Sequence, residues 1–125
     1  MKTTKIDLAY AAGFFDGEGC IHMRPNGQIH IDMTQYDTRP LQYIQEATGS
    51  ILRFRKNGKE YRLKTSNREL VVKFLKLVLP YLVLKREQAQ LAIEFIESKL
   101  RGRIHEPNIR EQYYERMKSL KRDRR

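Results

Sequence analysis

The chain has 125 residues, with 25 Lys and Arg against 15 Asp and Glu, which gives a formal net charge of +10 with neutral histidines. This length suits a single domain over residues 1–125, and the 40% hydrophobic content argues against disorder. The single cysteine excludes an internal disulfide framework and fits a reducing compartment. No apolar run reaches the length of a membrane span or a secretory signal. We therefore expect an intracellular, non-secreted protein without a membrane partner, in the cytoplasm, the nucleoid or an organelle matrix.

The large positive charge favours a polyanionic partner, because Lys and Arg neutralise phosphates and release condensed counterions. Nucleic acid is the first candidate, and an anionic membrane surface is the second. A basic protein that is merely soluble stays an alternative, so the position of the charges along the chain matters.

The first element is predicted to be a helix from Lys5 to about Asp16. Thr4 and Asp7 have the spacing of a capping box, and glycines in the 17–19 segment would end the helix. A stripe with i, i+3, i+4 and i+7 spacing consists mostly of small residues, along which a second helix could approach closely. Its members are Ala9, Ala12, Gly13 and Asp16. Packing within the chain is the alternative use of this stripe.

Alternation with period two then predicts two hairpins, each with one apolar and one polar face. The strands of the first hairpin cover residues 20–24 and 28–33, around a Pro-Asn-Gly turn. Those of the second cover 51–55 and 61–65, joined by residues 56–59. A short helix between the hairpins begins at Asp37 or Thr38 and ends at Gly49.

Three further helices are predicted. Ser66 and Glu69 form a second capping-box pattern that opens a helix ending before Pro80. Another helix runs from about residue 85 to 101, and Pro107 can begin the last one. The basic end, about 119–125, is expected to fray. The order is α-β-β-α-β-β-α followed by helices, which indicates an α+β fold with an antiparallel sheet.

The second hairpin carries six cations and one acid between residues 53 and 64. Four of the cations stand at alternating strand positions and so share one face, which would fit the major groove of DNA. The six are Arg53, Arg55, Lys56, Lys59, Arg62 and Lys64. A solvated sheet face is the alternative, although such faces usually mix both signs.

Glu18 follows the first helix, where a carboxylate faces unpaired carbonyls at a cost of about 0.3–1 kcal/mol. Asp16 adds to this conflict. A divalent cation would resolve it, because Mg²⁺ prefers carboxylate and carbonyl oxygens. Local capping by one acid and simple exposure of the other is an equal alternative.

The segment Ala11-Ala12-Gly13-Phe14-Phe15-Asp16-Gly17-Glu18-Gly19 resembles the nine-residue signature of the LAGLIDADG homing endonucleases. Glu18 stands where the family name has Asp, which is a common variant, and Phe14 and Phe15 replace aliphatic residues. The predicted order of elements is that of this family, and the 82–89 segment is similar to the opening of a later helix in single-motif members. The resemblance implies a four-stranded antiparallel saddle sheet with an additional C-terminal helix.

The resemblance also implies roles for individual residues. Glu18 and the carbonyl of Gly17 would bind the catalytic Mg²⁺, with Mn²⁺ or Ca²⁺ able to occupy the same site. Gln35 would order water near the scissile phosphate, and Lys85 would stabilise charge there. Their alternatives are a plain strand-end amide and a surface cation. DNA contacts are expected from the six cations of the second hairpin together with Arg24, Gln28, His30 and Asp32.

The chain has one copy of the motif, whereas cutting both strands of a duplex needs two carboxylates. Two chains would therefore pair through the stripe of the first helix and cut a nearly palindromic site. The expected function is a homodimeric, sequence-specific double-strand DNA endonuclease of intron homing that leaves short 3′ overhangs. One alternative is a non-cleaving protein of the same fold, either an intron RNA maturase or a DNA-binding module. Another is a basic adaptor that contacts proteins.

Cys20, His22 and His30 share one predicted strand face and raise zinc binding as a further alternative. Their spacing matches no ordinary zinc pattern, and the same face would contact bases. The sequence therefore favours base contacts on this face over a metal.

Overall fold

The structure of the protein, a computed structural model, describes residues 3–49, 53–100 and 106–122, without the side chains of 53–57, 99 and 100. In chain order the elements are α1 (Lys5–Glu18), β1 (Gly19–Met23), β2 (Ile29–Gln35), α2 (Thr38–Thr48), β3 (Arg53–Asn57), β4 (Glu60–Thr65), α3 (Arg68–Val78), the 3₁₀ helix η1 (Leu79–Tyr81), α4 (Arg86–Leu100) and α5 (Pro107–Arg122). The predicted α-β-β-α-β-β-α order is confirmed, with α4 and α5 following it. None of the described helices is both long and apolar enough to cross a membrane.

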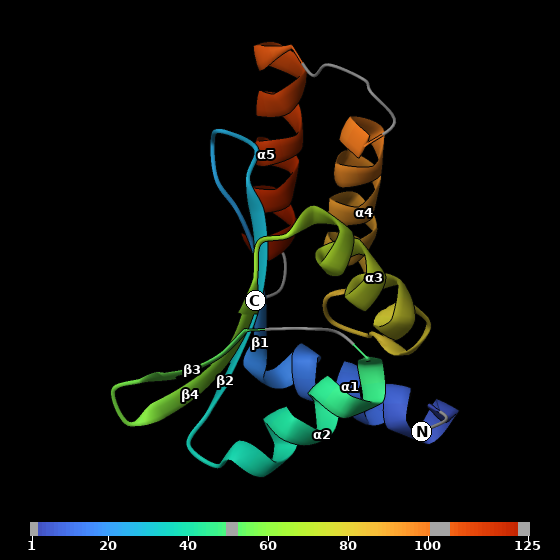
Figure 1. Cartoon of the computed structure of the whole chain (residues 1–125). Helices are drawn as coiled ribbons and strands as arrows, with labels where there is room; N and C mark the ends of the chain where they lie inside the picture. Colours follow the sequence, from blue (N-terminus) through green and yellow to red (C-terminus); the bar gives the residue numbers. More distant parts are fainter. Residues whose placement is uncertain (1–2, 50–52, 101–105, 123–125) are drawn as a thin grey trace.

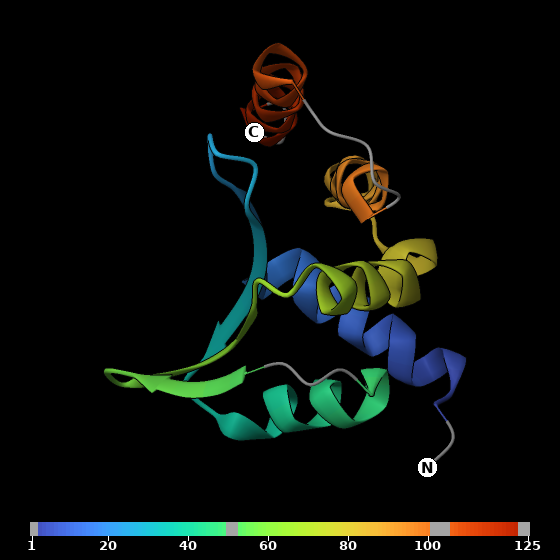
Figure 2. The same cartoon turned by 45° about the horizontal axis from the view of Figure 1, so that its top comes forward.

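The four strands form one antiparallel sheet in the order β1-β2-β4-β3. Each hairpin pairs its own two strands, and the contact between β2 and β4 joins the hairpins. The sheet is strongly curved, and α1 to α4 lie on its convex side (Figures 1 and 2). The concave side carries none of these four helices, so an extended surface is left there for a partner.

The core lies between the sheet and the helices because side chains alternate along each strand. Ile21 of β1 and Ile31 of β2 are fully buried on the helix side, as is Leu63 of β4. Phe15 of α1 meets Phe74 of α3 edge to face, with ring centroids 5.3 Å apart. The residues between the buried ones face the concave side, and these include the polar residues predicted to contact nucleic acid.

The end of α1 differs from the prediction. The helix continues through Glu18, and Gly19 is its C-cap. A Cβ atom at Gly19 would lie 2.2 Å from Cδ1 of Phe15, so glycine is required where α1 turns into β1. A Cβ atom at Gly17 would meet nothing within 4 Å, so packing within the subunit does not require glycine there, and the helix continues through it.

Side-chain caps fix two other helix starts. The predicted capping box of α1, between Thr4 and Asp7, is confirmed. The N-cap of α3 is Asn67 rather than Ser66, because the Asn67 side chain accepts the backbone N–H of Leu70. At the other end of the chain, residues 119–122 belong to α5, and the rest of the segment expected to fray lies outside the described residues. The predicted helix end at residue 101 and the first two residues of the 51–55 strand also lie outside them.

Candidate functional site

The last turn of α1 presents Glu18 to solvent. This residue adjoins the final helix carbonyls, which have no intrahelical donor. Gly19 pairs with Met33, so the corner lies at the end of the β1–β2 ladder where β2 finishes with Gln35. An exposed carboxylate beside open carbonyl oxygens supplies the ligands that a hard divalent cation prefers, so the residues present fit Mg²⁺.

Asp16 and Lys85 connect this end of α1 with the start of α4. The buried carboxylate of Asp16 accepts the backbone N–H groups of Val83, at 2.8 Å, and of Lys85, at 3.0 Å. The Lys85 ammonium in turn donates to the main-chain oxygen of Asp16 at 2.6 Å. Both contacts are electrostatically favourable. The Asp16 carboxylate meets N–H groups just before α4, and the Lys85 ammonium meets a carbonyl near the C-terminus of α1.

These reciprocal hydrogen bonds give the two acids at the C-terminal end of α1 different environments. Asp16 is satisfied inside the subunit and fixes the segment before α4, whereas Glu18 stays exposed. Lys85 is only 2% exposed, so it is not the surface cation that the sequence left as an alternative. Its Nζ contacts α1 two residues before Glu18 and therefore holds the acidic corner in place.

Gln35 lies partly buried at the end of β2. Its side-chain oxygen accepts the backbone N–H of the neighbouring Tyr36 at 2.8 Å. Its side-chain NH2 group can therefore donate a hydrogen bond to an acceptor outside the protein, such as water. An open hollow at this position is lined by Tyr10, Gln35, Asp37, Arg39, Pro40 and Tyr43.

The register of the sheet brings the predicted DNA-contacting residues together on the concave face. Their backbones form two rows that run from β2 across β4 to β3. The rows are Asp32–Lys64–Arg53 and Thr34–Arg62–Arg55. The side chains of Arg53, Arg55 and Lys56 lie outside the described part, so the structure places only their backbone. Arg24 and Gln28 are exposed at the tip of the first hairpin, and Lys59 is exposed at the tip of the second.

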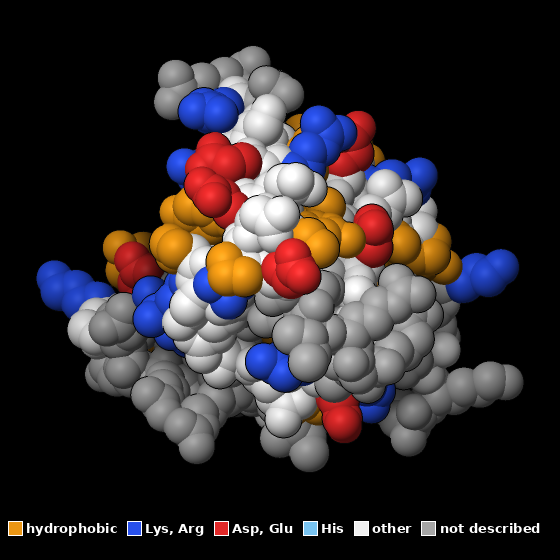
Figure 3. All heavy atoms as spheres, turned by 90° about the horizontal axis from the view of Figure 1, so that it is seen from above, with side chains coloured by type: hydrophobic (Ala, Val, Ile, Leu, Met, Phe, Trp, Pro, Cys, Tyr) orange, Lys and Arg blue, Asp and Glu red, His pale blue; other side chains and the backbone are white. Residues whose placement is uncertain are grey.

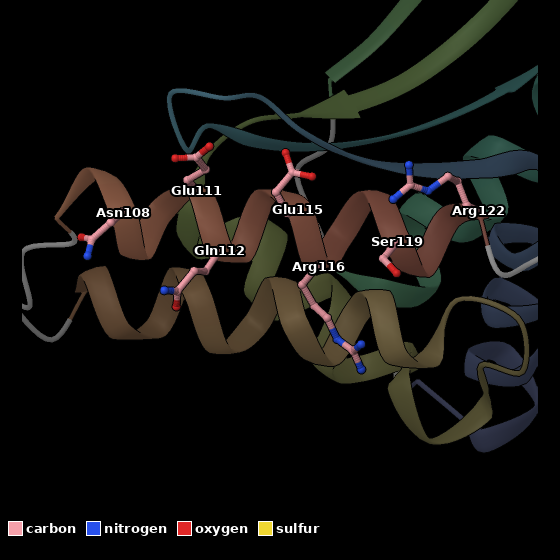
Figure 4. A pocket seen from close by; sticks show the side chains of 7 residues that line it. All are labelled: Asn108, Glu111, Gln112, Glu115, Arg116, Ser119 and Arg122. Carbon is pink, nitrogen blue, oxygen red and sulfur yellow. The ribbon is translucent and has the colours of Figure 1, made fainter.

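Two other parts of the surface carry charges of both signs. The face in Figure 3 carries Lys and Arg side by side with Asp and Glu. A hollow along α5 is lined by that helix alone among the described residues, with Glu111, Glu115 and Arg116 among its members (Figure 4).

Two histidines and an aspartate form a cluster on β1 and β2. His22 and His30 pair across the strands, and their rings stack with centroids 4.4 Å apart. Oδ2 of Asp32 lies 3.4 Å from Nε2 of His22 and 3.9 Å from Nε2 of His30. Burial lowers the pKa of His30 to about 4, aided by His22, Lys64 and Arg24 and opposed by Asp32. Burial also lowers the pKa of His22, so both imidazoles are neutral at pH 7.

We expect the His30 ring of the metal-free protein to titrate near pH 4, well below the ordinary value of 6.5. The unfolded state then binds this proton at higher pH than the folded state. Stability should therefore fall as the pH drops from about 6.5 towards 4, and this contribution should level off below the folded pKa. A proton NMR titration, assigned with a His30→Asn variant, measures the midpoint. A midpoint at or above 6.5 would contradict the burial of this ring.

The fold divides the predicted stripe of α1. Ala12 is fully buried and Asp16 is 9% exposed, so both face the core of their own subunit, while Ala9 and Gly13 are exposed. This corrects the expected contact surface for Ala12 and Asp16, which are not accessible to a second chain. The outer face of α1 consists of Ile6, Ala9, Tyr10, Gly13 and Gly17.

Two exposed hydrophobic residues, to which the sequence pattern assigned no role, lie beside this face. Val83 is 80% exposed and Leu84 is 54% exposed, and the hydrogen bond from Val83 to Asp16 places this pair next to the end of α1. Their position outside any predicted helix, between Pro80 and Lys85, is the signal that could have identified them.

Solved homing endonucleases have a similar structure. I-CvuI, in complex with the I-CreI target in the presence of Mg, shares 27% identity over 75% of this chain and 68% of its own, with a TM-score of 0.65. The archaeal intron-encoded I-Vdi141I, in complex with DNA, shares 17% identity over 94% of this chain and 83% of its own, with a TM-score of 0.72. I-TnaI shares 21% identity over 99% of this chain and 100% of its own, with a TM-score of 0.69. No protein-family model matches the chain, and the search of curated proteins finds no match.

The curved four-stranded sheet, its rows of cationic positions and the acidic corner at the end of the β1–β2 ladder together define the candidate site. The chain has the fold of the LAGLIDADG homing endonucleases, and the resemblance noted in the sequence is confirmed.

Proposed function

We propose that the protein is a sequence-specific double-strand DNA endonuclease that hydrolyses phosphodiester bonds with a divalent cation, Mg²⁺ in the first instance. The observation that carries the proposal is the exposed Glu18 at the end of α1, beside a concave sheet with cationic rows. The likeness to I-CvuI, whose structure contains a DNA target, supports the same substrate class. Such an enzyme meets its target inside the cell.

Each residue of the acidic corner has a defined task in this proposal. Glu18 and the carbonyl of Gly17 would hold the cation, which when bound would supply an activated water and offset charge on the phosphate. Gln35 would order a water molecule there through its amide nitrogen. Lys85 acts through its contact with the Asp16 carbonyl and keeps the corner in register with α4.

The concave sheet would lie in the major groove. Arg62 and Lys64 of β4, which pair in register with Arg55 and Arg53 of β3, would contact bases and phosphates. The tips of the hairpins extend the surface, with Arg24 and Gln28 at one end and Lys56 and Lys59 at the other. His30 and Asp32 belong to the middle of the same face.

Two copies of the chain would form the active enzyme, because one copy supplies one Glu18. A Cβ atom at Gly13 would meet nothing within 4 Å in the subunit, although glycine inside a helix costs about 1 kcal/mol relative to alanine. Close approach of a second α1 explains this cost. Ile6, 79% exposed, and Val83, 80% exposed, would be covered by the same contact.

A two-fold axis between the α1 helices would bring both Glu18 residues together over a nearly palindromic site, with short 3′ overhangs as the product.

Replacing Gly13 with Leu should convert the dimer into monomers that remain folded. The new side chain meets open space in the subunit, and leucine favours the helix, whereas a partner helix could no longer approach. Sedimentation velocity should show the dissociation constant rising by about tenfold or more, as expected when about 1.4 kcal/mol or more is lost.

Gln90→Leu is the matched control, since Gln90 is an exposed residue of α4, away from α1. It should leave the association unchanged. A Gly13→Leu protein that dimerises as tightly as the parent would show that α1 is not the contact between subunits.

Selection of cleaved sites from a randomised duplex library, in the presence of Mg²⁺, tests the function. The proposal expects recovery of one nearly palindromic family of sites with both strands cut. Binding to DNA or to structured RNA without any cut site would instead support the non-cleaving alternative. Weak DNA affinity that does not change with salt would support the adaptor, because phosphate contacts make affinity fall steeply with salt.

A further inference from the structure

The strands bring together three potential metal ligands that are separated in the sequence. His22 on β1 is the direct cross-strand partner of His30 on β2, and Asp32 follows His30 on the same face. One ligand atom from each of the three residues lies within 4.8 Å of the other two. The distances from Asp32 Oδ2 to the two Nε2 atoms are 3.4 Å and 3.9 Å. Tetrahedral zinc with bonds of about 2.0–2.1 Å separates its ligand atoms by about 3.3 Å, so small side-chain movements would close the site.

We propose that His22, His30 and Asp32 bind one divalent transition-metal ion, of which Zn²⁺ is the leading candidate, on the concave face of β1 and β2. This site is separate from the acidic corner at Glu18, and the inference does not rest on nuclease activity. Two imidazole nitrogens and one carboxylate oxygen form a set that leaves one tetrahedral position open. Water would complete the coordination in the protein alone.

The surroundings select against hard cations. Lys64, Arg62 and Lys121 act electrostatically on His22, and Lys64 and Arg24 act on His30, so the cluster lies in a positive field. An ion held mainly by charge, such as Mg²⁺ or Ca²⁺, gains little from one carboxylate in that field. An ion that bonds strongly to imidazole nitrogen can overcome it.

Cys20 supports the cluster without joining it. Its Sγ lies 3.8 Å from Nδ1 of His22, the ring nitrogen that does not face Asp32. When Nδ1 carries the proton and donates it to the sulfur, Nε2 keeps its lone pair available for a metal. Zinc-binding histidines usually donate the N–H of their other ring nitrogen to an outer partner in the same way. Nζ of Lys121 lies 4.0 Å from the same sulfur. The ligand set is therefore His-His-Asp and not the Cys-His-His set suggested by the sequence.

Metal binding is measured with protein that carries no histidine tag and has been treated with a chelator. Competition with a chromophoric chelator should give one Zn²⁺ per chain, and excess Mg²⁺ should not displace it. With Co²⁺, the visible absorption should be that of a tetrahedral site without a thiolate band. Zn²⁺ should also raise the melting temperature, because it binds only the folded state.

Variants assign the ligands. His22→Asn, His30→Asn and Asp32→Asn should each weaken Zn²⁺ binding by about tenfold or more, since even outer partners of zinc ligands are worth about 10–100-fold. His105→Asn replaces the remaining histidine and should bind like the parent. Melting curves of the metal-free variants show that each remains folded, and the 42% exposed side chain of His22 makes its replacement the safest of the three.

Three results would overturn the inference. These are no stoichiometric Zn²⁺ binding by the parent, unchanged binding by folded His22→Asn protein, and a Co²⁺ thiolate band that disappears in Cys20→Ser protein. The last result would assign the metal to Cys20. DNA cleavage is not read in any of these measurements, so failure of the nuclease proposal would leave the outcome unaffected.

Discussion

Replacing Glu18 with Gln should reduce DNA cleavage by about a thousandfold or more and leave DNA affinity within a few-fold of the parent. Glutamine keeps the size of the side chain but cannot ionise, so the cation loses its only side-chain ligand in the proposed corner. The activated water and the charge stabilisation that the cation supplies are lost with it, which accounts for the magnitude. Glu18 is exposed at the end of α1, so the fold should be unaffected.

Single-turnover cleavage of a selected duplex at saturating Mg²⁺ measures the first effect, and binding in Ca²⁺ measures the second. Glu46→Gln is the matched control, because Glu46 is an exposed acid of α2. It should cut at the parental rate. Cleavage by Glu18→Gln protein at that rate would exclude Glu18 as the metal ligand.

Replacing Asp16 with Ala should lower the free energy of unfolding by about 3–5 kcal/mol. The carboxylate accepts two backbone N–H groups in a buried position, and each hydrogen bond to a charged group is worth about 1.5–3 kcal/mol. Its loss also removes the two side-chain hydrogen bonds that tie the segment between η1 and α4 to α1, and leaves the bond from Lys85 to the main-chain oxygen of residue 16. A change of this size is a large share of the stability of a small domain, about 5–15 kcal/mol.

Urea unfolding at one fixed protein concentration gives the value, since dimerisation couples stability to concentration. Asp16→Asn keeps one acceptor oxygen and should fall between the parent and Asp16→Ala. Asp37→Ala is the control, because Asp37 caps α2 by accepting the backbone N–H of Arg39 and also pairs with the Arg39 guanidinium, all in an exposed position, so its loss should cost clearly less than that of Asp16. Equal costs for Asp16→Ala and Asp37→Ala would show that the connection between α1 and α4 does not stabilise the fold.

The fold was largely predictable because its signals are local. The capping box at Thr4, the Pro-Asn-Gly turn and the alternation of buried residues along β1 and β2 each depend on a few neighbouring residues. The boundaries that differed depend on contacts across the fold. Gly19, and not Gly17, ends α1 because Phe15 occupies the space where a Cβ atom would lie.

The site was predictable in part for the same reason. The motif marked Glu18, but the burial of Ala12 and Asp16 follows from packing against other elements, which helix spacing alone does not reveal. The resemblance implied that Lys85 stabilises charge at the phosphate, and only the approach of α4 to α1 shows its contact with the Asp16 carbonyl. The involvement of Asp32 with the histidines depends on strand register and side-chain direction.

Diffraction from crystals of the protein bound to its selected duplex, grown with Mn²⁺, tests the central claim most directly. The anomalous signal of manganese should appear beside the Glu18 carboxylate and the Gly17 carbonyl of both subunits, with the two α1 helices packed about a two-fold axis next to the scissile phosphates. A single bound subunit, or two subunits without manganese at either Glu18, would contradict the account.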